Sequence, residues 1–183
     1  RDPRHFNLVA TFSVRWRDGM RFRRSTFLVN MILSRPYRIG DFLSCLSIFD
    51  SNMPLFFTSE ERDDFAAFLA NLSGMDDHYL VVTLNEAVVA CGGLSFEVGS
   101  TSASLTWGMV HSGYHQQGLG KRLTEERLSR ARALVGVSDV LLSTSQHTYC
   151  FYGRFGFEIL KITPDGFGKG LDRYDMALAL GET

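Results

Sequence analysis

The sequence predicts a mixed α/β (α+β) fold with helices around a central sheet, and three observations indicate it. The predicted elements follow the order β-α-α-β-β-β-α-β-α-β-β, without internal repeats. Apolar side chains alternate with small or polar ones over 103–110, as in a half-buried strand. Apolar side chains then recur at helical spacing over 119–128, with charge on the opposite side. A chain of 183 residues is long enough for one domain with its own core.

The elements before the first hairpin are one short strand and two helices. The strand is predicted at 37–39, and Asp41 is the predicted N-cap of the helix that follows. Thr58 and Glu61 have the spacing of a capping box for a second helix, which runs through Leu72.

A β-hairpin occupies the middle of the sequence. Its predicted strands are 78–84 and 87–96, and the two residues between them, Asn85 and Glu86, form a tight turn. The pair Gly92–Gly93 inside the second strand indicates a bulge or the close approach of another group.

The elements after the strongly periodic helix are shorter. We expect a buried strand at 140–144, a short helix at 146–155 and a strand at 157–162. A glycine-rich loop is predicted at 164–170, and the last strand at 174–180.

The connection between strand 103–110 and the next helix has the features of an anion site. Gly118 and Gly120 flank the helix start, where backbone N–H groups lack intrahelical partners and the helix dipole is positive. Lys121 and Arg122 add positive charge there. A P-loop is excluded because Arg122 follows Gly120-Lys121, and a dinucleotide fingerprint is excluded because Leu123 stands where its third glycine or alanine would be.

Two segments resemble the GNAT N-acetyltransferase superfamily, which uses acetyl-CoA. The first resembles motif A and reads VHSGYHQQGLGKRL, with Gly118 and Gly120 at the glycine positions and His115 where the family has Gln or Arg. The second resembles motif B and reads SQHTYCFYGRFGF. There Tyr152 matches the family tyrosine, and Ser145 stands where an asparagine is frequent.

The resemblance covers about 36–180 and implies a central mixed, mostly antiparallel sheet flanked by helices. It implies acetyl-CoA as co-substrate and transfer of its acetyl group to a primary amine of a small molecule or peptide, by direct attack on the thioester. The cofactor-binding residues that it implies are Met109, Val110, His115, Gln116, Gln117, Gly118, Leu119, Gly120, Lys121, Ser145 and Tyr152.

The same resemblance suggests chemical roles. A free N–H at Met109 or Val110 would hold the carbonyl oxygen as charge develops on it. Tyr152 would protonate the leaving thiolate, since a phenol is protonated at neutral pH; the alternative is a core tyrosine. Glu97 or His111 would accept the ammonium proton, directly or through water; the alternative for each is a surface residue.

Other side chains have two interpretations each. Phe56 and Phe57 are either walls of the substrate pocket or core residues under a loop. For His147 we expect a solvated or capping role. His111 and His115 lie four apart in a loop with no carboxylate between them, so no metal site is expected.

Composition excludes several classes of protein. Residues 1–34 hold seven Arg and two Asp, which leaves twelve of the 19 Lys and Arg and eighteen of the 20 Asp and Glu for 35–183. A weakly acidic domain favours a cationic substrate over nucleic acid. The sequence has no run of 18 apolar residues, so it predicts no membrane-spanning helix. Three widely spaced cysteines fit a reducing, cytoplasmic setting.

The sequence leaves the nature of residues 1–34, the exact function and the substrates open. We predict 1–34 to be a poorly ordered or non-native extension, with a targeting peptide as the alternative, and 35–183 to be the acetyltransferase domain. A CoA-binding sensor of the same fold without turnover is the alternative function. A longer acyl group and acceptors from aminoglycosides to protein N-termini are all compatible with the sequence. Many members of the family form homodimers, and the sequence identifies no interface.

Overall fold

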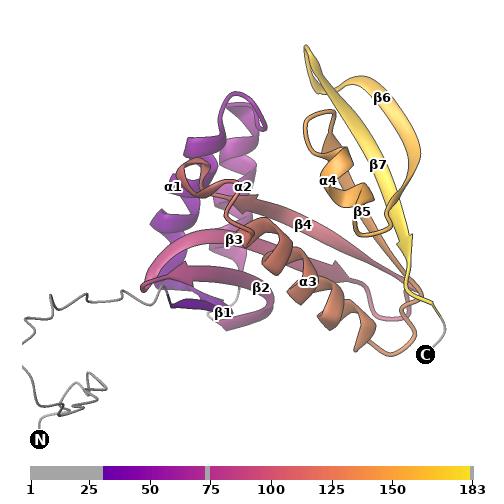
Figure 1. The fold of residues 1–183 in the computed structure, drawn as a ribbon, viewed down its shortest axis with the longest axis horizontal. Coiled ribbons are helices and arrows are strands. Elements are labelled where there is room, and N and C mark those ends of the chain that lie inside the picture. The colour runs from indigo at the N-terminus through magenta and orange to yellow at the C-terminus, as the bar shows by residue number, and fades with distance from the viewer. Residues whose placement is uncertain (1–30, 73–74, 182–183) are drawn as a thin grey trace, which may run out of the picture.

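The computed structural model describes residues 31–72 and 75–181, and this part of the chain folds around one seven-stranded sheet of order β1-β2-β3-β4-β5-β7-β6 (Figure 1). The strands are β1 (Ile32–Arg38), β2 (Met75–Leu84), β3 (Ala87–Phe96), β4 (Ser102–Val110), β5 (Asp139–Ser145), β6 (Glu158–Gly168) and β7 (Leu171–Ala179). The helices are α1 (Phe42–Asn52), α2 (Glu60–Asn71), α3 (Leu119–Arg132) and α4 (Tyr149–Gly153), with 3-10 turns η1 (Ile39–Asp41) and η2 (Ser112–Tyr114). Only β4 and β5 pair in parallel, so the predicted mixed, mostly antiparallel sheet is confirmed.

Helices cover both faces of the sheet. Along β2, Leu80 and Val82 pack with α3, whereas Tyr79 and Val81 pack with α1 and α2. Because successive side chains of a strand point to opposite faces, α3 and the α1–α2 pair lie on opposite sides. Figure 1 shows α3 across one face and α4 beside β5 and β7. No helix in the described ranges is long and apolar enough to span a bilayer.

The first strand is longer than the sequence predicts. β1 begins at Ile32 rather than at Tyr37. Its pairing with β2 starts at Ile32, which lies opposite Leu84. The strand therefore starts inside the segment predicted as an extension. Residues 1–30 lie outside the described part of the chain, and the prediction made for them stays a prediction.

The predicted glycine-rich loop is wrong in its extent. Most of 164–170 belongs to β6 and β7, which form one long hairpin with irregular register between Thr163 and Gly168. Pro164 is compatible with this strand because β6 is at the edge of the sheet, where a missing N–H breaks no ladder. The helix predicted at 146–155 is also too long, since only Tyr149–Gly153 is helical.

The two predicted helix starts differ in detail. The capping box is present, because Thr58 N–H donates to the Glu61 carboxylate at 2.8 Å and Glu61 N–H donates to Thr58 Oγ1 at 3.4 Å. Asp41 precedes α1, but its carboxylate accepts from Arg38 N–H and from the Arg35 guanidinium instead of capping α1. Burial raises the pKa of the Asp41 carboxyl, yet these hydrogen bonds outweigh burial and hold the pKa below its ordinary value.

The hairpin and its glycine pair agree with the predictions. Asn85 and Glu86 have φ of 49° and 72°, which suits the tight turn of a two-residue hairpin. The β3–β4 register shifts at Gly92, so that Trp107 and Gly108 both face this one residue, and Trp107 has φ of 45°. This bulge bends β4 in its second half.

The bend matters because β4 and β5 then separate. Their parallel pairing extends only from Ser102 to Ser104 on β4, although β4 continues to Val110. Figure 1 shows the two strands diverging from the end that they share near the C-terminus. The backbone groups of β4 beyond Ser104 consequently have no strand partner on their β5 side.

Candidate functional site

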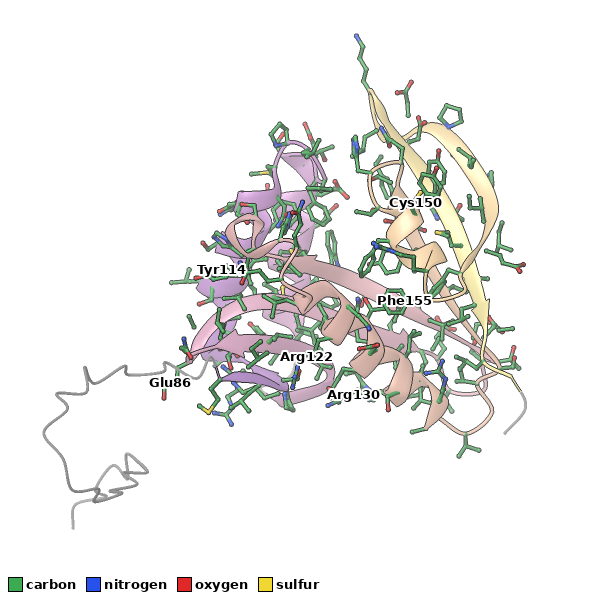
Figure 2. The ribbon with its side chains drawn as sticks, viewed as in Figure 1. Glu86, Tyr114, Arg122, Arg130, Cys150 and Phe155 are labelled. Carbon is green, nitrogen blue, oxygen red and sulfur yellow. The ribbon has the colours of Figure 1, made fainter. Side chains whose placement is uncertain are left out.

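A cavity of about 1100 Å³ occupies the space where β4 and β5 separate. It is bounded by the second half of β4, the end of β5, the start of α3, the region of α4 and the loop between α1 and α2. Tyr114 and Phe155, both labelled in Figure 2, line it from η2 and from the residues after α4. The segments predicted to carry the chemistry therefore meet in one cavity.

The start of α3 faces this cavity. Gly118 is the N-cap and has φ of 79°, a left-handed conformation that strains any residue with a Cβ. A Cβ on Gly120 would come within ordinary contact of Phe151 and Val110, at 3.6 and 3.7 Å. Gly118, Gly120 and Lys121 all line the cavity. The N–H groups of the first turn are thus presented where an anionic group can approach the backbone.

The end of β4 is held from the side of α1. Asn52 Nδ2 and His115 Nε2 each lie 2.9 Å from the Val110 carbonyl oxygen. His111 N–H donates instead to Val89 on β3, at 2.8 Å. Since neighbouring residues of a strand direct their N–H groups to opposite sides, the N–H of Val110 points into the cavity. By the same alternation, the N–H of Gly108 also points into the cavity, whereas the N–H of Met109 points toward β3.

Tyr152 lies on the opposite wall. Its half-buried ring packs edge-to-face against Phe151 and Phe157, with centroids 5.0 and 5.9 Å away, and it also lines the cavity. Ser145, at the end of β5, is buried and accepts a hydrogen bond of 3.4 Å from His147 N–H. Tyr152 is therefore both a core residue and a cavity residue, so that its two interpretations are compatible.

Aromatic side chains form the wall nearest α1 and α2. Phe56 and Phe57 line the cavity, and Phe57 also stacks on Phe49 of the core at 4.8 Å. The Phe56 ring lies 5.9 Å from the His115 ring and 6.0 Å from the His147 ring. Among the described residues that line the cavity, Glu61 alone carries a carboxylate.

Most residues predicted for the cofactor line the cavity, with Gln117 as the exception. The two candidates for the general base do not line it: Glu97 follows the end of β3, and the His111 Nδ1 accepts from Gly113 N–H at 3.1 Å. Among the side chains that the structure describes, in 31–72 and 78–181, no three His, Cys, Asp or Glu residues are grouped as metal ligands.

Several cavity residues have no sequence signal of their own. Asn52 lies in a helix and Phe167 in the predicted loop. Thr124 and Arg127 lie on the buried face of α3 that its leucines mark. A buried Arg within an apolar stripe is the one feature that pattern inspection could have singled out.

Comparison with known proteins supports the resemblance that the two motifs carry. Residues 75–159 match the family model described as "Acetyltransferase (GNAT) domain". The resemblance to the GNAT superfamily is confirmed. The matched residues contain the hairpin, β4, α3, β5 and α4, which together build most of the cavity. No curated protein sequence matches the chain.

Solved structures share the GNAT fold over nearly their whole length. Ard1 from Thermoplasma volcanium has a TM-score of 0.68 at 19% identity, with 82% of this chain and 99% of that chain covered. The ribosomal-protein-S18-alanine N-acetyltransferase from Escherichia coli has a TM-score of 0.66 at 18% identity, covering 84% and 96%. The protein yncA from Salmonella typhimurium, solved with its cofactor acetyl-CoA, has a TM-score of 0.64 at 19% identity, covering 84% and 96%. These likenesses establish the fold.

Proposed function

We propose that this protein is an acetyl-CoA-dependent N-acetyltransferase that acetylates a primary amine of a small molecule or peptide. The observation that carries the proposal is the convergence on one cavity of the α3 N-terminus, the inward N–H groups of β4 and the Tyr152 ring. The GNAT match and the structure of yncA with acetyl-CoA support the same assignment. When bound, acetyl-CoA would supply an activated acyl group as its thioester.

The residues of the cavity fit this co-substrate. The first turn of α3, with Gly118, Gly120 and Lys121, offers N–H groups and positive charge to a pyrophosphate. The unpaired β5-side edge of β4 offers backbone groups to the amides of an extended chain, as a strand partner would. The Val110 or Gly108 N–H is directed to hold the thioester oxygen, where such donors act most strongly as negative charge develops.

Tyr152 is our candidate for the general acid. Its ring lines the wall that faces the end of β4, so that a thiolate leaving from that end would be within its reach. A positioned proton donor of this kind contributes a factor of about 10² to 10⁴ to the rate.

The structure favours a different residue as the general base from those that the sequence suggested. Glu97 and His111, the candidates from the sequence, lie outside the cavity lining, whereas His147 lies within it beside Phe56. In the described part of the chain, the His147 ring has no hydrogen-bond partner. We therefore propose that His147 accepts the proton, directly or through water. His147→Gln should lower kcat, whereas Glu97→Gln and His111→Gln should leave kcat unchanged; the reverse pattern would contradict this assignment.

The acceptor side favours a cation. Phe56, Phe57 and Trp107 line the cavity together with the Glu61 carboxylate. An ammonium group is stabilised by aromatic faces and by a nearby carboxylate. The amine acceptor predicted from the sequence is consistent with this wall.

The proposal is tested by thiol release. The full chain is incubated with acetyl-CoA and a panel of amines that contains polyamines, an aminoglycoside, amino acids and peptides with free N-termini, and free CoA thiol is measured. Turnover with one class of amine supports the proposal. Binding of acetyl-CoA without release with any amine would favour the sensor alternative, and absence of binding would refute both.

A further inference from the structure

Arg127 of α3 is a buried cation that has no counter-ion among the described side chains. Its side chain is 1% exposed. Nε donates to the Leu123 carbonyl at 3.3 Å and Nη2 to Thr124 Oγ1 at 3.4 Å, two long bonds within its own helix. Nη1 is buried and has no hydrogen-bond partner among the described residues, and no carboxylate among the described side chains of 31–72 and 78–181 lies within ion-pair distance of it. Buried charges in proteins are normally paired, because their desolvation is costly.

Two glycines of the sheet make room for this side chain. A Cβ on Gly108 would lie 2.6 Å from Arg127 Nη1, and a Cβ on Gly92 would lie 3.1 Å from the same atom. Both glycines sit at the bulge where β3 and β4 change register. The sheet thus lacks side chains at the two positions against which the guanidinium packs, and a Cβ on Gly108 would require the guanidinium to shift.

The guanidinium lines the part of the cavity on the α3 side of the sheet. Arg127 lines the cavity together with Leu105 and Leu142, on the α3 side of the sheet. It adjoins Gly108, whose N–H is one of the two that point into the cavity. An acyl chain whose thioester oxygen is held by this N–H, and which extends to the α3 side, would therefore meet Arg127. Phe57 and Trp107, which line the proposed acceptor side of the cavity, pack with α1 and α2 on the opposite face of the sheet.

We propose that Arg127 binds a carboxylate at the far end of the acyl group, so that the cleft accepts short dicarboxylic acyl groups such as malonyl or succinyl. The proposal rests on the proposed acyl-CoA function. The amine nitrogen bonds to the thioester carbon, the C–S bond breaks, sulfur leaves with a proton as the CoA thiol, and the carboxylate is unchanged. The guanidinium fork matches a carboxylate with two parallel N–H bonds.

The wild-type chain gives the first test. Calorimetric titration with CoA, acetyl-CoA, malonyl-CoA and succinyl-CoA, without an acceptor, should show one dicarboxylic thioester binding about 10- to 100-fold more tightly than acetyl-CoA, as a charge-assisted bond predicts. Equal or weaker binding of both would overturn this inference and leave the proposed function standing. Failure of all four to bind would overturn both.

Variants assign the preference to one side chain. Arg127→Met should abolish the preference and leave acetyl-CoA binding unchanged, and the apo-protein should melt at an equal or higher temperature because a buried unpaired charge is gone. Arg154, another cation that lines the cavity, is the matched control. Arg154→Met should weaken all thioesters alike and keep the preference. A preference that survives Arg127→Met, or that is lost in Arg154→Met alone, would overturn the inference. So would an effect of Arg127→Met confined to acceptors that carry a carboxylate.

Discussion

Gly120→Val separates the stability of the domain from cofactor binding. Gly120 is the second residue of α3, and a Cβ there meets only the Phe151 and Val110 side chains within 4 Å, at ordinary contact distances. Valine has a somewhat higher helix propensity than glycine, so the free energy of unfolding should change by no more than about 1 kcal/mol. The added methyl groups instead occupy the approach to the N–H groups of the first turn.

The loss of affinity follows from those N–H groups. Two hydrogen bonds to a charged phosphate contribute about 3 kcal/mol together, so the substitution should weaken acetyl-CoA about 100-fold. At a concentration 100 times the wild-type Kd, the ligand stabilises the wild type by about 2.7 kcal/mol and the variant by about 0.4 kcal/mol. For a domain of this size, these energies correspond to Tm shifts of about 5–10 °C and about 1–2 °C.

The assay is thermal denaturation of the full chain and of Gly120→Val, each with and without acetyl-CoA. The two apo-proteins should melt within a few degrees of each other, and only the wild type should respond strongly to the ligand. An equal shift in both proteins would refute the assignment of the anion site to the start of α3. The lack of a shift in either would refute the cofactor itself.

Three further results are expected. Tyr152→Phe should lower kcat by about 10²- to 10⁴-fold with the Kd for acetyl-CoA unchanged, as single-turnover and binding measurements would show; an unchanged kcat would remove Tyr152 from the mechanism. Asp41→Asn should lower the free energy of unfolding by about 1–3 kcal/mol in urea denaturation, since it removes charge-assisted bonds. Because the pKa of Asp41 is lowered by folding, its contribution is complete above the ordinary carboxyl pKa and is lost as pH falls through the folded-state value, so the gap between wild type and variant should close in acid. The Cys91 hydrogen bond and burial raise the pKa of the Cys45 thiol, so a disulfide reagent should modify the exposed Cys150 in the native protein and reach Cys45 and Cys91 only after unfolding.

Local patterns predicted most of the elements and the glycine-flanked start of α3. The hairpin strand 87–96 and its turn at Asn85 were predictable because strand alternation and turn residues act over a few positions. The glycines around the start of α3 were predictable for the same reason, since the geometry of a helix N-terminus is local. The prediction of Tyr152 depended on the resemblance of two motifs to one family, because helical spacing by itself describes a core residue equally well.

The long hairpin of β6 and β7 shows where local patterns end. Pro164 and the glycines near it have the composition of a loop, and only the position of β6 at the edge of the sheet allows them to form a strand. The cavity likewise depends on distant contacts: Asn52 holds the Val110 carbonyl from another helix, 58 residues away in the chain.

What the sequence by itself determined is the fold class, the resemblance to the GNAT superfamily and the glycine-flanked start of α3, because each is encoded in contiguous segments. What only the tertiary structure decided is the shape of the cavity and the residues that line it. The bulge at Trp107, the separation of β4 from β5, the position of His147 within the lining and the placement of Arg127 against Gly92 and Gly108 all arise from register and packing between elements. Periodicity along one strand or helix cannot specify such contacts, because they are set by which residues of different elements come to face one another.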